Sequence, residues 1–86
     1  MHIKASINKC EQQQGNKVAD VEFLVDGSLL IHNCHLYCKN GEYRLQFPFY
    51  RNHDNPQIRM DYIHPINNET RELFLQAAVQ EYENTL

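Results

Sequence analysis

The stretch HNCHLYC places four residues of zinc-ligand type within seven positions: His32, Cys34, His35 and Cys38. Imidazole and thiolate groups are the usual ligands of a structural zinc ion. The surrounding pattern predicts a β-strand, and strict alternation then puts His32, Cys34 and Cys38 on one face and His35 on the other. Side chains two residues apart on one face stand about 6.5–7 Å apart, too far for two ligands of one tetrahedral ion. We therefore expect no metal site, with Cys34 a small buried residue, Cys38 beside a hairpin, and His32 a hydrogen-bonded inner residue.

A cysteine nucleophile is the second chemistry that these residue types allow. Cys34 could pair with His32 or with His64, as catalytic thiols pair with an imidazole base. The sequence shows no third group to orient the base and no oxyanion hole, and its three glycines form no loop that would cradle a phosphate. We predict that the protein is not an enzyme and needs no cofactor.

Length, composition and cysteine count limit the class of protein. A chain of 86 residues, 42% hydrophobic and 22% charged, predicts one folded domain spanning residues 1–86. No window has the roughly 18 consecutive apolar residues of a membrane span, and MHIKASINKC lacks the apolar centre of a signal peptide. Three irregularly spaced cysteines predict free thiols in a reducing compartment, so we expect a cytoplasmic protein with no membrane partner. The net charge of -3 argues against unspecific binding to nucleic acid.

Alternation of apolar and polar residues predicts five β-strands. They cover residues 3–7, 19–25, 29–38, 43–49 and 58–62. Asp26-Gly27 and Asn40-Gly41 suit tight hairpin turns. Pro48 cannot donate to a ladder, so it must lie at an edge or at the end of a strand. Residues 29–38 are rather apolar at both odd and even positions, and hence on both faces of the strand, which predicts a central strand or one at a subunit contact.

After Pro65 the period becomes that of a helix. The apolar stripe consists of Phe74, Leu75, Ala78, Val79 and Tyr82. Asn67 or Asn68 can cap this helix, and Glu69 and Glu72 suit the positive end of its dipole. The sequence thus predicts an α+β fold: an antiparallel sheet of about five strands followed by one C-terminal α-helix.

The segment IHPINNETR forms the corner between the last strand and the helix. Pro65 fixes its own φ and pushes His64 towards an extended conformation, so the fifth strand must end there. Ile66 is expected to pin the corner to the core. Arg71 would lie in the first helical turn, beside free N–H groups, where a phosphate can be held.

Several segments of the chain, this corner included, resemble those of a known family. HPINNETRELFLQAAVQEY closely resembles the end of the bacterial SpoVG family (stage V sporulation protein G). FLVDGSLLIHNCHLY resembles that family's central strand, with His32 at its histidine position, and FPFYR resembles its segment of proline followed by a basic residue. The resemblance covers roughly residues 18–83. It implies a small sheet with a C-terminal helix, a cytoplasmic homodimer, and a regulator that binds DNA or RNA and influences septation in cell division, sporulation or gene expression.

The residues that match the family's motifs can be named one by one. They are His32, Arg51, His64, Pro65, Asn67, Thr70 and Arg71. Two departures stand out: the loop after Arg51 looks longer than usual, and the helix carries Glu72, Glu81 and Glu83 with Arg71 as its one cation.

A nucleic-acid surface can be assembled from the predicted strands. Alternation places Lys4, His35, Arg44 and Arg59 on the outer face of the sheet, with Arg51 and His53 in the neighbouring loop and Arg71 at the helix start. Asp20, Glu22 and Asp61 share this face, so an ordinary mixed-charge surface is the alternative. Tyr37 and Tyr50 could stack on bases or could pack.

The second candidate function is a non-enzymatic interaction module of the same fold. Its acidic C-terminal helix would contact another protein, and its own affinity for nucleic acid would be low. For either function we predict a homodimer, because the core of so short a chain is thin and residues 29–36 are apolar on both faces.

Overall fold

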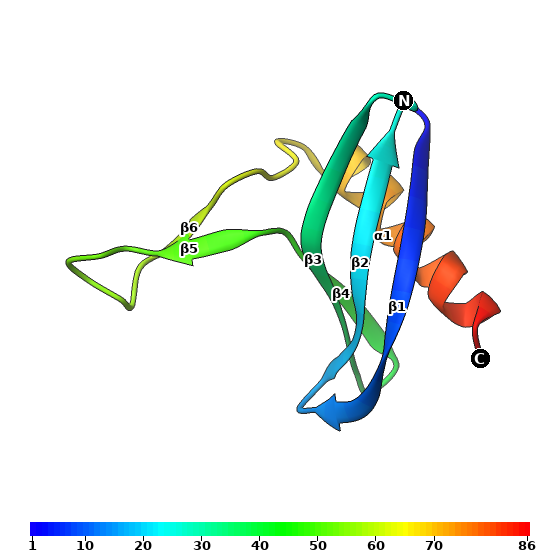
Figure 1. Ribbon diagram of the computed structural model, residues 1–86, viewed down its shortest axis with the longest axis horizontal. Coiled ribbons are helices and arrows are strands. Elements are labelled where there is room, and N and C mark those ends of the chain that lie inside the picture. The colour runs from blue at the N-terminus through cyan, green and yellow to red at the C-terminus, as the bar shows by residue number, and fades with distance from the viewer.

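The computed structural model describes the backbone of residues 1–86 and the side chains of residues 1–10 and 15–86. It confirms the α+β class. The elements are β1 (Ile3–Gln14), β2 (Lys17–Val25), β3 (Leu29–Lys39), β4 (Glu42–Gln46), β5 (Phe49–Arg51), β6 (Arg59–Asp61) and α1 (Asn68–Asn84). The first four strands form an antiparallel sheet in the order β1-β2-β3-β4, and α1 covers one face of it (Figure 1).

The two predicted hairpin turns are confirmed. Asp26 and Gly27 have φ values of 51° and 66°, and Asn40 and Gly41 have φ values of 53° and 80°. Two successive positive φ values give a turn whose twist matches that of the flanking strands, which is why Asp-Gly and Asn-Gly are favoured there. The second of these turns fixes the register of β4 on β3, which in turn places the candidate site described below.

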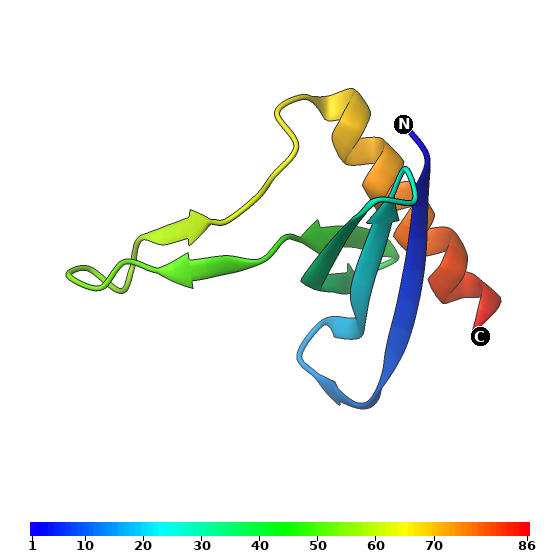
Figure 2. The same cartoon turned by 45° about the horizontal axis from the view of Figure 1, so that its top comes forward.

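Pro48 divides the strand that the sequence predicts at residues 43–49. β4 ends at Gln46 and β5 begins at Phe49, so Pro48 lies at a strand end, as predicted. β5 pairs with β6, and this two-stranded hairpin, here called the arm, projects away from the four-stranded sheet (Figures 1 and 2). The residues predicted as a fifth strand therefore pair within the arm, and Tyr62 N–H donates to the Pro48 carbonyl at its base at 3.0 Å.

The core lies between the helix and the inner face of the sheet. Three phenylalanine rings form its centre: Phe23 from β2, Phe47 after β4, and Phe74 from α1. Phe74 meets Phe23 edge to face at 4.9 Å and Phe47 at 5.4 Å between ring centroids. Each such pair stabilises by roughly 0.5–1.5 kcal/mol beyond its area burial. In the part of the chain that the structure describes, no helix is long and apolar enough to cross a membrane.

A β-bulge changes which residues of β3 face the core. Val21 pairs with Cys34 and Phe23 pairs with Ile31, so Glu22 stands opposite both His32 and Asn33. Asn33 takes a left-handed φ of 63°, a conformation that asparagine tolerates better than most residues. The extra residue shifts the alternation by one position. His32 consequently lies on the outer face and is exposed, so the prediction that it is an inner residue sharing a face with Cys34 is wrong.

The corner before the helix is built differently from expectation in one respect. Pro65 is buried, whereas Ile66 is 90% exposed, so the prediction that Ile66 pins the corner to the core is wrong. The proline ring occupies the apolar position itself. Asn67, with an extended backbone, follows as the N-cap of α1.

Candidate nucleic-acid interface

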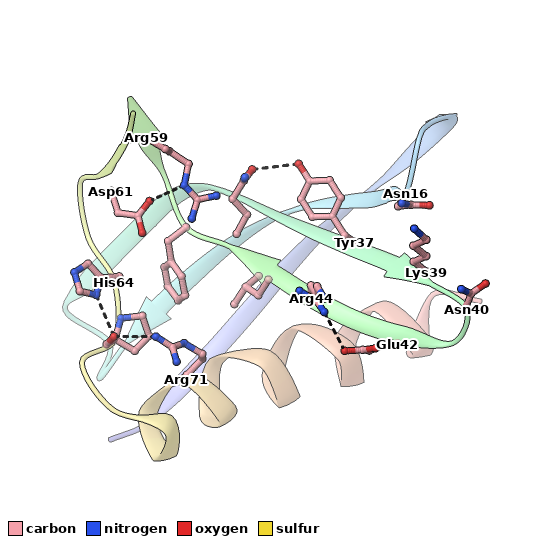
Figure 3. Close-up of a pocket in the computed structure, with 14 residues that line it drawn as sticks. Asn16, Tyr37, Lys39, Asn40, Glu42, Arg44, Arg59, Asp61, His64 and Arg71 are labelled. Atoms are coloured by element: carbon pink, nitrogen blue, oxygen red, sulfur yellow. Dashed lines mark hydrogen bonds and ion pairs between the residues drawn. The ribbon is translucent and has the colours of Figure 1, made fainter. Parts of the chain in front are cut away.

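A groove with a volume of about 620 Å³ runs along β4, the edge strand of the four-stranded sheet (Figure 3). We call it the β4 groove. Its lining residues come from the β1–β2 turn, β3, the β3–β4 turn, β4 and the residue after it, β6, the corner before α1 and the first turn of α1. They are Asn16, Tyr37, Lys39, Asn40, Glu42, Arg44, Leu45, Gln46, Phe47, Arg59, Asp61, His64, Pro65 and Arg71.

Arg44 is placed by the register of β4. It pairs with Tyr37 of β3, and its side chain is 79% exposed. Its guanidinium lies 3.5 Å from a carboxylate oxygen of Glu42, two residues earlier on the same strand. An ion pair this exposed contributes little stability, so the guanidinium can exchange its partner for an anion at low cost.

Arg59 reaches the groove because the arm has two different faces. The register pairs Tyr50 with Met60 and Arg51 with Arg59, so tyrosine and methionine share one face while the two arginines share the other. The charged face carries Arg59, whose Nε lies 3.4 Å from Asp61, and both residues line the groove. The apolar face therefore points away from the groove.

The corner before α1 supplies His64, and the first turn of α1 supplies Arg71. The Asn67 side chain accepts a hydrogen bond from the Thr70 backbone N–H at 2.8 Å, which caps the helix as predicted. Arg71, one turn into the helix, donates to the Pro65 carbonyl at 3.5 Å and to the Asn68 side chain at 3.1 Å. His64 Nδ1 donates to the same Pro65 carbonyl at 3.1 Å. Figure 3 shows both side chains at the end of the groove, near Asp61.

The charges around the β4 groove are predominantly positive. Its four cations are Lys39, Arg44, Arg59 and Arg71, and its two carboxylates are Glu42 and Asp61, which leaves a net charge of +2 with His64 neutral. The whole chain carries a net charge of -3. The groove is thus a positively charged region of an acidic protein, which favours an anionic ligand at this place rather than over the surface at large.

Three of the six residues predicted to bind nucleic acid line the groove, namely Arg44, Arg59 and Arg71. The other three do not. Lys4 is exposed on β1, at the opposite edge of the sheet; Arg51 lies in the arm, and His53 is exposed beyond the end of β5. Lys39 was missed, although it stands directly before the Asn40-Gly41 turn, whose hairpin chemistry places it beside Glu42.

The outer face of the sheet is occupied by matched charges. Asp20 contacts Lys17 at 2.7 Å and His35 at 2.8 Å, while Glu22 contacts His32 at 3.0 Å. Hydrogen bonding to the Lys17 ammonium, with His35 acting in the same direction, holds the pKa of Asp20 below its ordinary value. Because these histidines and Lys17 already contact carboxylates, this surface is less favourable for binding phosphates than the β4 groove is.

The residues that suggested zinc or a nucleophile are kept apart. Among the described side chains, no group of three or more His, Cys, Asp or Glu residues is placed to hold a metal ion. Cys34 has no exposed surface and lies in the core, where desolvation raises the pKa of its thiol to about 12. A thiol this deeply buried and protonated is poorly suited to nucleophilic attack.

Neither a scan against protein-family models nor a search of curated proteins finds a match to this chain.

Proposed function

We propose that this protein binds nucleic acid through the β4 groove. The observation that carries the proposal is the convergence of Lys39, Arg44, Arg59 and Arg71 from four separate segments onto one groove of an otherwise acidic chain. A phosphate backbone is the ligand for which a row of exposed cations is suited, because each neutralised phosphate releases a bound counterion.

The resemblance to the SpoVG family supports the same proposal and extends it to a cytoplasmic regulator of septation, sporulation or gene expression. The corner that carries the resemblance has a local structural role here: Asn67 caps α1, Pro65 is buried, and Arg71 donates to the Pro65 carbonyl at the groove. In this proposal the corner contributes one cation and the rigid geometry that aims it.

The proposal includes a homodimer formed through the arm. A two-stranded hairpin is at best marginally stable alone in water, so a projecting arm gains from a partner. Its apolar face carries Tyr50, Met60 and Tyr62, which are 42%, 40% and 71% exposed. Covering this face with a second copy would stabilise the arm, and with it the position of Arg59, and would double the number of cationic grooves.

A fluorescence-anisotropy titration of labelled DNA and RNA tests the proposal, at low and at physiological salt. The slope of log K against log salt is about -0.9 per phosphate neutralised for duplex and about -0.7 for single strands. Arg44→Ala/Arg59→Ala should weaken low-salt binding about tenfold and reduce the slope by about 1.5.

The matched control is Lys4→Ala/Lys9→Ala, which removes the same charge from exposed positions on β1. It should leave affinity within about twofold of the unchanged protein. Equal losses in both double variants would show that total charge, not the groove, determines binding. No binding of any nucleic acid at low salt would overturn the proposal.

The alternative, a protein-interaction module, has one observation in its favour. The exposed side chains of α1 include Glu69, Glu72, Glu81 and Glu83, and its last turn carries no basic residue, so the helix itself repels phosphates. A partner protein captured through this helix would bind independently of Arg44 and Arg59. Glu72→Lys/Glu83→Lys would abolish that capture, whereas nucleic-acid binding would be retained or strengthened, because the variant removes two phosphate-repelling carboxylates.

A further inference from the structure

We infer that the β4 groove takes single-stranded nucleic acid in preference to duplex, with a base inserted into the groove and phosphates on its rim. This rests on the proposed function and adds the class of nucleic acid and the residue that would contact a base.

The first observation is the apolar floor of the groove. Phe47 is 8% exposed, Pro65 is buried and Leu45 is half-buried, and all three line the groove together with its cations. A duplex presents phosphates and sugars outward and keeps its bases stacked inside, so it would meet the cationic rim and leave this floor in water. An unstacked base is a flat, largely apolar group that can cover such a floor.

The second observation is the set of hydrogen-bonding groups beside that floor. β4 has a partner strand on one side only, so alternate residues of β4 direct their backbone N–H and C=O groups towards the groove. The side-chain amides of Asn16, Asn40 and Gln46 add both donors and acceptors. Donors and acceptors together match the edges of bases, whereas phosphate oxygens only accept.

The third observation is the position of Tyr37. This half-buried residue lines the groove from β3, the strand next to β4, and its hydroxyl donates to the Gln46 side chain at 3.1 Å. Figure 3 shows it between Asn16 and Lys39 on one side and the middle of the groove on the other. The hydrogen bond fixes the orientation of the ring, and a fixed aromatic ring beside cations is the usual platform on which single-stranded bases stack.

The experiment compares one labelled oligonucleotide, single-stranded and as its duplex, at the same low salt. The unchanged protein should bind the single strand at least about tenfold more tightly, the scale expected for one stacked base. Tyr37→Leu should lose about that factor for the single strand and leave duplex binding unchanged. Tyr37→Phe, which keeps the ring, should retain most of the affinity.

Tyr82→Leu is the matched control. Tyr82 lies on α1, where its ring meets that of Tyr43 at 6.1 Å between centroids, and it lines neither the groove nor the arm. Since the chain has five tyrosines and no tryptophan, quenching of its intrinsic fluorescence by a single strand reports stacking directly. The quenching should survive Tyr82→Leu and fall in Tyr37→Leu.

Two results would overturn the inference without touching the proposed function. One is duplex binding that equals or exceeds single-strand binding and still depends on Arg44 and Arg59. The other is loss of single-strand binding in Tyr82→Leu but not in Tyr37→Leu. Absence of binding to either form would instead overturn the proposed function.

Discussion

Arg71 donates a hydrogen bond from its guanidinium to the main-chain carbonyl of Pro65 at 3.5 Å, which ties the first turn of α1 back to the corner that precedes it. The same carbonyl accepts from His64 at 3.1 Å. A proline carbonyl has two lone pairs and can serve both donors. The corner, the helix start and one wall of the β4 groove are therefore one connected unit.

The cap of this unit gives the first prediction. Asn67→Ala removes the side-chain acceptor for Thr70 N–H and should lower the free energy of unfolding by about 1 kcal/mol. Asn67→Ser keeps a capping oxygen and should stay close to the unchanged protein. Urea denaturation followed by circular dichroism measures both, and identical losses in the two variants would contradict the capping role.

The three-phenylalanine centre gives the second prediction. Phe74→Ala should lower the free energy of unfolding by about 3–5 kcal/mol, because it leaves a cavity between Phe23 and Phe47. Its neighbour Leu73 is 50% exposed, so Leu73→Ala should change stability by no more than about 0.5 kcal/mol. If Phe74→Ala does not fold, Phe74→Leu provides the measurement, and it should fall between the other two.

Cys34 gives a prediction about alkaline pH. Its thiol has a pKa of about 12 in the folded state against 9.0 for the unperturbed group, because burial disfavours the thiolate. The unfolded chain therefore loses this proton first. The stabilising contribution is complete below pH 9 and declines as the pH rises from 9 towards 12.

Measurement of unfolding free energy between about pH 8 and 10.5 tests this, in the unchanged protein and in Cys34→Ala. The difference between the two curves isolates Cys34 from the other groups that titrate in this range, including Tyr43, whose pKa burial also raises. We expect the unchanged protein to lose more stability with rising pH than the variant. Parallel curves would show that the thiol is not held protonated.

The arm gives a prediction about assembly. Met60→Ser/Tyr62→Ser makes its exposed apolar face polar and should shift the protein from dimer to monomer at micromolar concentration, measured by light scattering. Leu73→Ser, at a 50% exposed position on α1, should leave the dimer intact. A monomeric mass for the unchanged protein at this concentration would refute the dimer, and a dimeric mass for the arm variant would move the interface elsewhere.

Local chemistry made much of the fold predictable. The Asp-Gly and Asn-Gly turns, the Asn67 cap and the strand end at Pro48 each depend on a few adjacent residues, whose backbone preferences decide the outcome. Ile66 shows the limit of the same reasoning. Hydrophobicity alone predicted that it would be buried, but the adjacent Pro65 ring occupies the apolar position instead.

The candidate site was only partly predictable, because it depends on how distant segments meet. Arg59 was assigned to the outer face of the main sheet, yet it reaches Arg44 and Arg71 through the arm. Alternation describes faces within one sheet and cannot tell that a strand belongs to another. Lys39 could have been found from the hairpin register, whereas the approach of the corner to β4 is a tertiary contact with no local signal.

The bulge at Asn33 has a consequence for how this chain can vary. Asn33 is the extra residue that the bulge accommodates, so a strand without it would return to strict alternation, with Ile31, Cys34 and Leu36 still facing the core and His35 and Tyr37 still on the outer face. Most substitutions in β3 alter one position. The loss of a residue after Cys34, by contrast, would put part of the strand on the wrong face, so the bulge is the place where β3 can change its length without disturbing the interior or the groove.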